Sequence, residues 1–234
     1  MTVFFCLPIF GVTLTLLAYF ISGKLQERIG RIFFNRVFVS VVLIIVVLLM
    51  FNIDFETYNN GAKYISFFLG PSVVALGVFL YEKLEEVKND LKVFLIAVFV
   101  GGLIGMISVI LILILCGTPD IISRSLVAKS VTTPIAIEIT KILEGIPEIT
   151  AGIVIITGIL GNAFGSIVLK KLGVKNKKAI GTALGTAAHG IGTAKAFEIS
   201  ISAGTYSGLA MCFNGLITAL LAPYILNWLF IFIH

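Results

Sequence analysis

The stretch AIGTALGTAAHGIGTAKAFE, Ala179 to Glu198, is apolar enough to enter a lipid bilayer, yet it contains four glycines and three ionisable side chains. Each glycine inside a helix costs about 0.5–1 kcal/mol relative to alanine, so an unbroken helix is unfavourable here. We predict a break at His189 and Gly190 that leaves two half-helices, 180–188 and 192–199. Free backbone groups at such a break need protein partners, because lipid offers none. The stretch therefore predicts a polar centre within a membrane protein.

The composition of the whole chain agrees with a membrane protein. Hydrophobic residues make up 59% of the 234 residues and charged residues only 12%, and the mean hydropathy of +1.11 is far above that of soluble proteins. Charge-free runs cover 1–23, 37–53, 93–119, 149–169 and 199–234. Each approaches or exceeds the roughly 17 to 25 residues that a spanning helix needs. We expect an all-α polytopic membrane protein with about seven or eight membrane segments, some of them broken or re-entrant helices.

The lysines and arginines between these runs predict the orientation of the chain, because cytoplasmic loops are enriched in them. Basic loops at 24–36, 82–92 and 170–178 are assigned to the inside, and 52–63, with two acidic residues and one lysine, to the outside. The N-terminus is then outside, and the first run is not a cleavable signal, because basic residues follow it. This orientation also explains the net charge of +5 without a nucleic-acid partner.

A weak internal repeat relates two parts of the chain. Pro71 precedes the Gly-x3-Gly pair at 101–105 by 30 residues, and Pro134 precedes the pair at 161–165 by 27. The two parts run in opposite directions, and inverted repeats are typical of secondary transporters that bind substrate at the bilayer midplane. The alternative is that Gly-x3-Gly only lets helices approach closely. The predicted organisation of this single membrane domain is scaffold helices at 1–53, one repeat at 64–116, a second at 128–199 and a final helix region at 203–233.

The segment 117–148 has to leave and return on one side of the membrane. Its 32 residues include Pro119, Pro134 and Pro147, so it is too short and too interrupted for two ordinary spans. We expect a short helix together with a re-entrant or broken one. The membrane tolerates such backbone only where protein or a cavity satisfies its polar groups.

The stretch AKSVTTPIAIEIT, 128–140, contains a strong helix-start signal. Its hydroxyl residues Ser130, Thr132 and Thr133 come directly before Pro134. A helix that begins there presents free N–H groups and a partial positive charge, which suit an anion. Lys129, immediately upstream, either pairs with Glu138 or Glu198 or gives its charge to a ligand. The alternative is that Lys129 extends to the membrane interface.

The residues around the predicted break complete the candidate substrate site. His189 is the single histidine away from the end of the chain, and ionisable groups at membrane depth commonly line pathways or proton relays. The alternative is a neutral histidine bonded to a neighbouring carbonyl. Thr186 and Thr193 flank the break and can cap its ends or bind a ligand. The remaining predicted residues are Gly190, Gly192 and Asn162 in the substrate site, with Lys195 as a charge partner beside Glu138 and Glu198.

Other chemistries have no support in the sequence. It contains no set of metal ligands at the required spacing, no P-loop and no nucleophile elbow. We therefore expect neither an enzyme nor a bound cofactor or metal. Cys6, Cys116 and Cys212 lie in apolar runs and are expected to be small buried core residues.

Several stretches closely resemble the LrgB family, also called CidB/LrgB or antiholin-like proteins. They are AKSVTTPIAIEIT at 128–140, GIPEITAGIVIITGILGNAFG at 145–165, GTALGTAAHGIGTAKAFE at 181–198 and FFLGPSVVALGVFLYEK at 67–83. The resemblance runs from Thr2 to about Asn227. The chain departs from the usual family pattern at Ala188, where a small hydroxyl residue is expected, and at Lys195, where arginine is more usual. The first departure removes a potential ligand contact, and the second keeps the charge without the planar fork of arginine.

The resemblance implies two different functions in the bacterial plasma membrane. One is regulation of murein hydrolase activity and autolysis together with a holin-like LrgA/CidA partner. The other is transport of small carboxylates, since a fused plant relative looks like a glycolate/glycerate exporter and bacterial relatives are linked to pyruvate. The predicted inverted repeat and anion-facing helix start favour a secondary transporter for glycolate-, glycerate- or pyruvate-like monocarboxylates. Coupling to protons, coupling to Na+ and uncoupled transport all fit, and analogy with other transporters suggests a homodimer.

Overall fold

A computed structural model describes residues 7–29 and 36–233 of the chain. It is 87% helical, and the described residues contain no strand, which confirms the all-α prediction. Cys6, which was expected to be a buried core residue, lies outside the described residues. So do residues 30–35 of the basic loop at 24–36. The chain divides into two compact units, Met1–Ser72 and Val73–His234, each of which is described by itself below.

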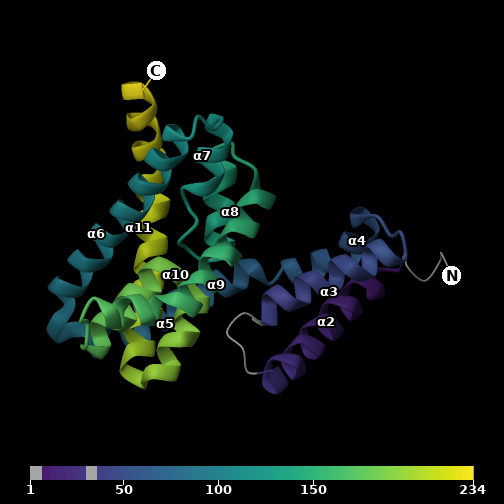
Figure 1. Ribbon diagram of the computed structural model, residues 1–234, viewed down its shortest axis with the longest axis horizontal. Helices are drawn as coiled ribbons and strands as arrows, with labels where there is room; N and C mark the ends of the chain where they lie inside the picture. Colours follow the sequence, from purple (N-terminus) through teal and green to yellow (C-terminus); the bar gives the residue numbers. More distant parts are fainter. Residues whose placement is uncertain (1–6, 30–35, 234) are drawn as a thin grey trace. The chain divides into compact units, whose positions relative to one another are not determined.

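The described residues of the first unit include the helices α2 (Pro8–Ile29), α3 (Arg36–Met50) and α4 (Phe55–Ser66), labelled in Figure 1. The segment 52–63, assigned to the outside from its charges, is largely helical and forms most of α4. Asp54 caps this helix, since its Oδ2 accepts a hydrogen bond from the Thr57 N–H at 3.0 Å. Gly11 lets α2 cross α4 closely, because a Cβ there would lie 2.3 Å from the Tyr58 carbonyl oxygen.

The second unit begins at Val73, directly after the first turn of α5 (Leu69–Val87). Pro71 lies in that first turn, where its missing N–H leaves no helical bond unmade. The short helix η1 (Lys88–Asp90) leads into α6 (Leu91–Leu115). The later helices are α7 (Asp120–Leu126), α8 (Thr133–Ile142), α9 (Pro147–Lys171), α10 (Lys177–Ile199) and α11 (Ile201–Ile233).

Four stretches of the described residues are long and apolar enough to cross a membrane: Pro8–Arg28, Phe55–Leu115, Pro147–Lys171 and Ile201–Phe230. The second has 61 residues, and a continuous helix of that length would measure about 90 Å against a hydrocarbon core of about 30 Å. The turn at 67–68 and the short helix η1 divide this stretch into the helices α4, α5 and α6.

The helices of segment 117–148 are too short to cross a bilayer. α7 has seven residues and α8 has ten, so α8 is about 15 Å long. They pack against neighbouring helices, α7 against α6 and α9, and α8 against α9 and α11. This arrangement agrees with the expectation that the segment does not form two ordinary spans.

The core of the second unit lies around α11. This helix runs beside α10 and also contacts α6 and α8 (Figure 1). One cluster of fully or nearly fully buried side chains joins α6, α8 and α11, with Ile110, Ala136 and Leu226 among them. Cys212 on α11 is half-buried. Cys116, however, is exposed at the end of α6, so the expectation of a buried core residue is wrong there.

Candidate functional site

The helix α10 is broken at Ala188 and His189, as the sequence predicts. Ala188 has φ −131° and ψ 16°, and His189 has φ 41° and ψ −136°, both outside helical geometry. A positive φ is strained for a histidine and persists only where surrounding contacts hold it. The glycines of this stretch do not leave the helix themselves. Gly192 permits the bend, because a Cβ there would lie 2.5 Å from the Leu184 carbonyl oxygen.

Hydrogen bonds satisfy the groups at the break. The His189 Nε2–H donates to the Val154 carbonyl at 2.9 Å, since a carbonyl can only accept. The Thr193 hydroxyl donates to the His189 carbonyl at 2.9 Å. The Asn162 amide on α9 donates to the Ile191 carbonyl at 3.1 Å. His189 therefore has the arrangement that the sequence analysis gave as the alternative to a proton relay.

The helix start in the stretch 128–140 also lies where the sequence predicts it. Thr132 has extended geometry at the N-cap of α8, and Pro134 lies in the first turn. The Thr132 side chain makes no capping hydrogen bond. Its buried Oγ1 has no hydrogen-bond partner among the described residues.

A cavity of about 690 Å³ lies between α6, α10, α11 and the α7–α8 loop. On α6 its lining runs from Val93 to Met106, a distance of about 20 Å at the rise of an α-helix. On α10 the lining ends with Thr186 and Ala187, directly before the break. We call the end near Thr186 the inner end. The opposite end, formed by η1 and the beginning of α10, is the mouth.

Polar groups gather at the inner end of the cavity. The Lys129 ammonium donates to the Ser130 hydroxyl at 3.1 Å. The Asn214 side chain is only 1% exposed, and its amide donates to the carbonyls of Thr186 at 3.0 Å and Ser130 at 3.3 Å. Because both carbonyls can only accept, they fix the direction of the amide. The Asn214 Oδ1 is then left without a partner among the described residues.

The cavity brings together only part of the predicted substrate site. Lys129, Ser130 and Thr186 line it. The other predicted residues do not line it: Thr132, Thr133, Pro134, Asn162, His189, Gly190, Gly192 and Thr193. The two Gly-x3-Gly pairs also differ in role. The pair at 101–105 lines the cavity, whereas the pair at 161–165 contacts α10.

The expected charge partners of Lys129 are engaged elsewhere. Glu138 pairs with Lys141 at 2.7 Å, and Glu198 pairs with Lys195 at 2.7 Å, both within one helical turn. Within the described part of the chain, no ion pair involves Lys129. The suggestion that Lys129 pairs with either glutamate is therefore wrong, because each glutamate has a lysine three residues away on its own helix.

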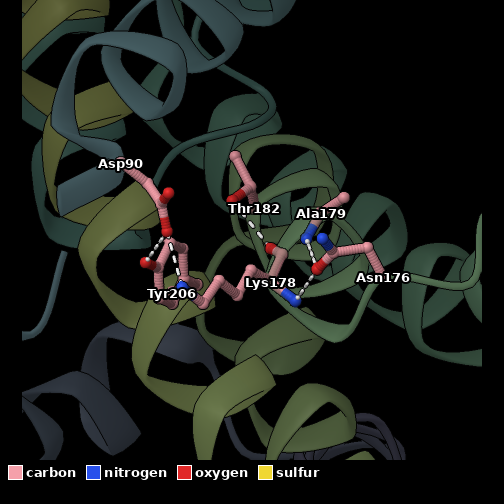
Figure 2. A network of polar contacts seen from close by, with 6 residues as sticks. All are labelled: Asp90, Asn176, Lys178, Ala179, Thr182 and Tyr206. Atoms are coloured by element: carbon pink, nitrogen blue, oxygen red, sulfur yellow. Dashed lines mark hydrogen bonds and ion pairs between the residues drawn. The ribbon is translucent and has the colours of Figure 1, made fainter.

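A second polar cluster lies at the mouth of the cavity (Figure 2). The Asp90 carboxylate accepts hydrogen bonds from the Lys178 ammonium at 2.5 Å and the Tyr206 hydroxyl at 2.9 Å. Asp90 lies in η1 and Lys178 in the first turn of α10, and their side chains are 44% and 47% exposed. The hydrogen bond from Lys178 lowers the pKa of Asp90, and that bond in turn raises the pKa of Lys178.

The sequence analysis missed seven polar residues that line this cavity: Asp90, Asn176, Lys178, Thr182, Tyr206, Asn214 and Thr218. Asn214 had a visible signal, because it is an amide within the charge-free run at 199–234, where a polar side chain needs a partner. The polar cluster at the mouth had no such signal, because its residues are separated by up to 116 residues along the chain.

Comparison with known proteins identifies the family. A family model described as the LrgB-like family matches residues 15–228. The chain belongs to the LrgB family. An antiholin-like protein LrgB of Bacillus cereus is 35% identical, with 92% of this chain and 94% of that protein aligned. YwbG of Bacillus subtilis and a protein of Haemophilus influenzae are each 34% identical over 94% of this chain, with 98% and 95% of those proteins aligned. No solved structure matches the chain. LrgB membership and the long apolar helices together make this a membrane protein.

Proposed function

We propose that this LrgB protein carries a small monocarboxylate of the glycolate, glycerate or pyruvate type across the membrane through the cavity. The observation that carries the proposal is Lys129, whose ammonium lies at the inner end of the cavity and makes no ion pair among the described residues. A charged group at membrane depth is costly unless it is paired, so a bound anion would stabilise it.

Neighbouring groups would orient such a ligand. The Ser130 hydroxyl lies 3.1 Å from the Lys129 ammonium and can donate to a second carboxylate oxygen. The apolar side chains of Met106 and Val127 in the lining would exclude water around the ligand and strengthen the charge interaction. A ligand as small as pyruvate fills only part of the cavity, which suits a carrier of several related acids.

The break in α10 supports movement around this site. The lining residues Thr186 and Ala187 directly precede Ala188 and His189, so a change of angle at the break would move the second half of α10 beside the inner end of the cavity. Coupling to protons through His189, coupling to Na+ and the homodimer stay predictions from the sequence.

The test is uptake of radiolabelled glycolate, lactate and pyruvate by proteoliposomes that contain purified protein. Lys129→Gln should lower uptake about tenfold or more, because the variant keeps a polar side chain but loses the positive charge. Lys141→Gln is the matched control, since this nearby lysine pairs with Glu138 at the surface. We expect uptake by the control within about twofold of wild type. Wild-type uptake that does not saturate, or equal uptake by both variants, would refute the proposal.

A second function is favoured by the name of the Bacillus cereus relatives, antiholin-like protein LrgB. That name supports regulation of murein hydrolase activity and autolysis through a holin-like LrgA partner, and it does not support carboxylate transport. The two functions predict different autolysis rates in cells that carry the Lys129→Gln variant. A regulator that acts through its partner should leave the autolysis rate unchanged, whereas a role that depends on carboxylate transport should alter it.

A further inference from the structure

We propose that Lys178 and Tyr206 form an outer carboxylate-binding site at the mouth of the cavity, and that Asp90 occupies this site until a ligand displaces it. The choice of a carboxylate as ligand rests on the proposed function. The outer site would be the first to meet an anion that enters from the mouth, with the site at Lys129 as its destination at the inner end of the cavity.

The geometry of the cluster carries this inference. A single oxygen of Asp90, Oδ2, accepts both the Lys178 ammonium hydrogen bond at 2.5 Å and the Tyr206 hydroxyl hydrogen bond at 2.9 Å (Figure 2). The Lys178 nitrogen also lies 5.3 Å from the centre of the Tyr206 ring. A ligand carboxylate with one oxygen at this position would make the same two hydrogen bonds. Asp90 therefore acts as a built-in mimic of the ligand.

The backbone that carries each donor is held in place independently of Asp90. Asn176 caps α10 by accepting from the N–H groups of Lys178 at 2.9 Å and Ala179 at 3.4 Å. The Thr182 hydroxyl donates to the Lys178 carbonyl at 2.9 Å. These contacts fix the backbone from which the Lys178 side chain extends, as Figure 2 shows. Tyr206 lies on α11, which packs along α10.

Asp90 is the replaceable member of the cluster. It stands at the N-cap of α6, yet its side chain makes no capping hydrogen bond to that helix. Its pair with Lys178 is nearly half exposed, and exposed ion pairs contribute little to stability. A ligand carboxylate can therefore exchange with Asp90 at little cost, whereas loss of Lys178 would remove the site itself.

The experiment measures equilibrium binding of radiolabelled pyruvate to purified protein in the Lys129→Gln background, so that the inner site does not contribute. Adding Asp90→Ala should lower the dissociation constant about two- to fivefold, the range expected when a competing exposed ion pair is removed. Adding Lys178→Gln to both substitutions should abolish this gain. Tyr206→Phe keeps the ring, and should weaken binding in the background with Asp90→Ala.

The matched control is Glu85→Ala in the same background. Glu85 forms an exposed ion pair with Lys88 beside the same turn, but it does not line the cavity. We expect it to leave pyruvate binding unchanged. If Asp90 instead serves only to hold η1 to α10, Asp90→Ala should bind pyruvate equally or more weakly. That result overturns the inference, and so does an increase in affinity that remains after Lys178→Gln is added.

The outcomes for the two sites are distinguishable. If Lys129→Gln alone loses uptake and Asp90→Ala brings no tighter binding, the outer site is wrong and the proposed function stands. If the wild-type protein takes up no carboxylate and Asp90→Ala binds none, the proposed function and the outer site both fail. Should Asp90→Ala fold poorly, Asp90→Asn replaces it, with tighter binding expected and equal or weaker binding overturning the proposal.

Discussion

Replacing Gly161 by alanine tests how closely α9 approaches the break in α10. An added Cβ at this position would lie 2.1 Å from the Cβ of Ala188. Carbon atoms in contact normally lie about 3.5–4.0 Å apart, so one of the two backbones has to move. Neither methyl group can rotate away, because a Cβ is fixed by the backbone that carries it.

Two effects of opposite sign determine the stability of Gly161→Ala. Alanine in a helix is favoured over glycine by about 0.8–1.0 kcal/mol. Overfilling a tight contact costs about 1–3 kcal/mol. The clash dominates over most of this range, with a net loss of up to about 2 kcal/mol. Gly152→Ala in the same helix is the matched control, since nothing lies within 4 Å of its added Cβ. The control should gain stability, and the two variants should differ by about 1–3 kcal/mol.

The free energy of unfolding of the purified protein in detergent measures this difference. A double-mutant cycle adds Ala188→Gly, which leaves the Ala188 Cα at 3.4 Å as the nearest atom to the new Cβ. The double variant should recover most of the loss, with a coupling energy of about 1–3 kcal/mol. Equal stability of Gly161→Ala and Gly152→Ala, or no recovery in the double variant, would show that α9 does not approach the break as described.

Three further results are expected. Asn214→Leu should lower the free energy of unfolding by about 1–2 kcal/mol, because its hydrogen bonds to the Thr186 and Ser130 carbonyls are lost, and equal unfolding curves would contradict this. Gly181→Ala places a Cβ 2.1 Å from a backbone oxygen of α11 and should destabilise the protein by about 1–3 kcal/mol, whereas Gly190→Ala, 3.8 Å from its nearest neighbour, should not. The stabilisation by the Asp90–Lys178 pair should be constant between about pH 5 and pH 9. Because the pKa of Asp90 is lowered and that of Lys178 is raised, the stabilisation is lost only below this range, as Asp90 is protonated, and above it, as Lys178 is deprotonated. Thermal unfolding of wild type and Asp90→Ala at several pH values checks this expectation.

The break in α10 shows what the sequence could predict and where it stopped. Glycines and ionisable residues in an apolar stretch predicted that the helix breaks near His189. They could not predict which residues leave the helix, because contacts with α9 decide this. The Val154 carbonyl accepts from His189, and Asn162 donates to a carbonyl just beyond the break. Val154 is 35 residues away from His189 along the chain, and Asn162 is 29 residues away from Ile191. Local sequence patterns do not show contacts over such separations.

The sequence also predicted only some of the residues that line the cavity. Lys129 was predicted because a charge beside a helix start is visible in the sequence, and it lies at the inner end. His189 was expected beside it, yet its imidazole bonds the Val154 carbonyl on α9. Polarity at membrane depth indicates that a side chain needs a partner. It does not tell whether that partner is a ligand or a neighbouring helix, and only the direction of the side chain decides between them.

The close contacts of α10 indicate which part of it can move. Gly181 and Gly185 bring its first half against α11, because a Cβ at either position would lie 2.1 Å from a backbone oxygen of that helix. The first half carries Lys178 at the mouth and Thr186 at the inner end, so it joins both polar clusters in one rigid element about 12 Å long. A change at the break cannot separate this half from α11 without breaking that contact. We therefore expect any movement hinged at Ala188 and His189 to carry the second half of α10, while the donors that line the cavity stay fixed.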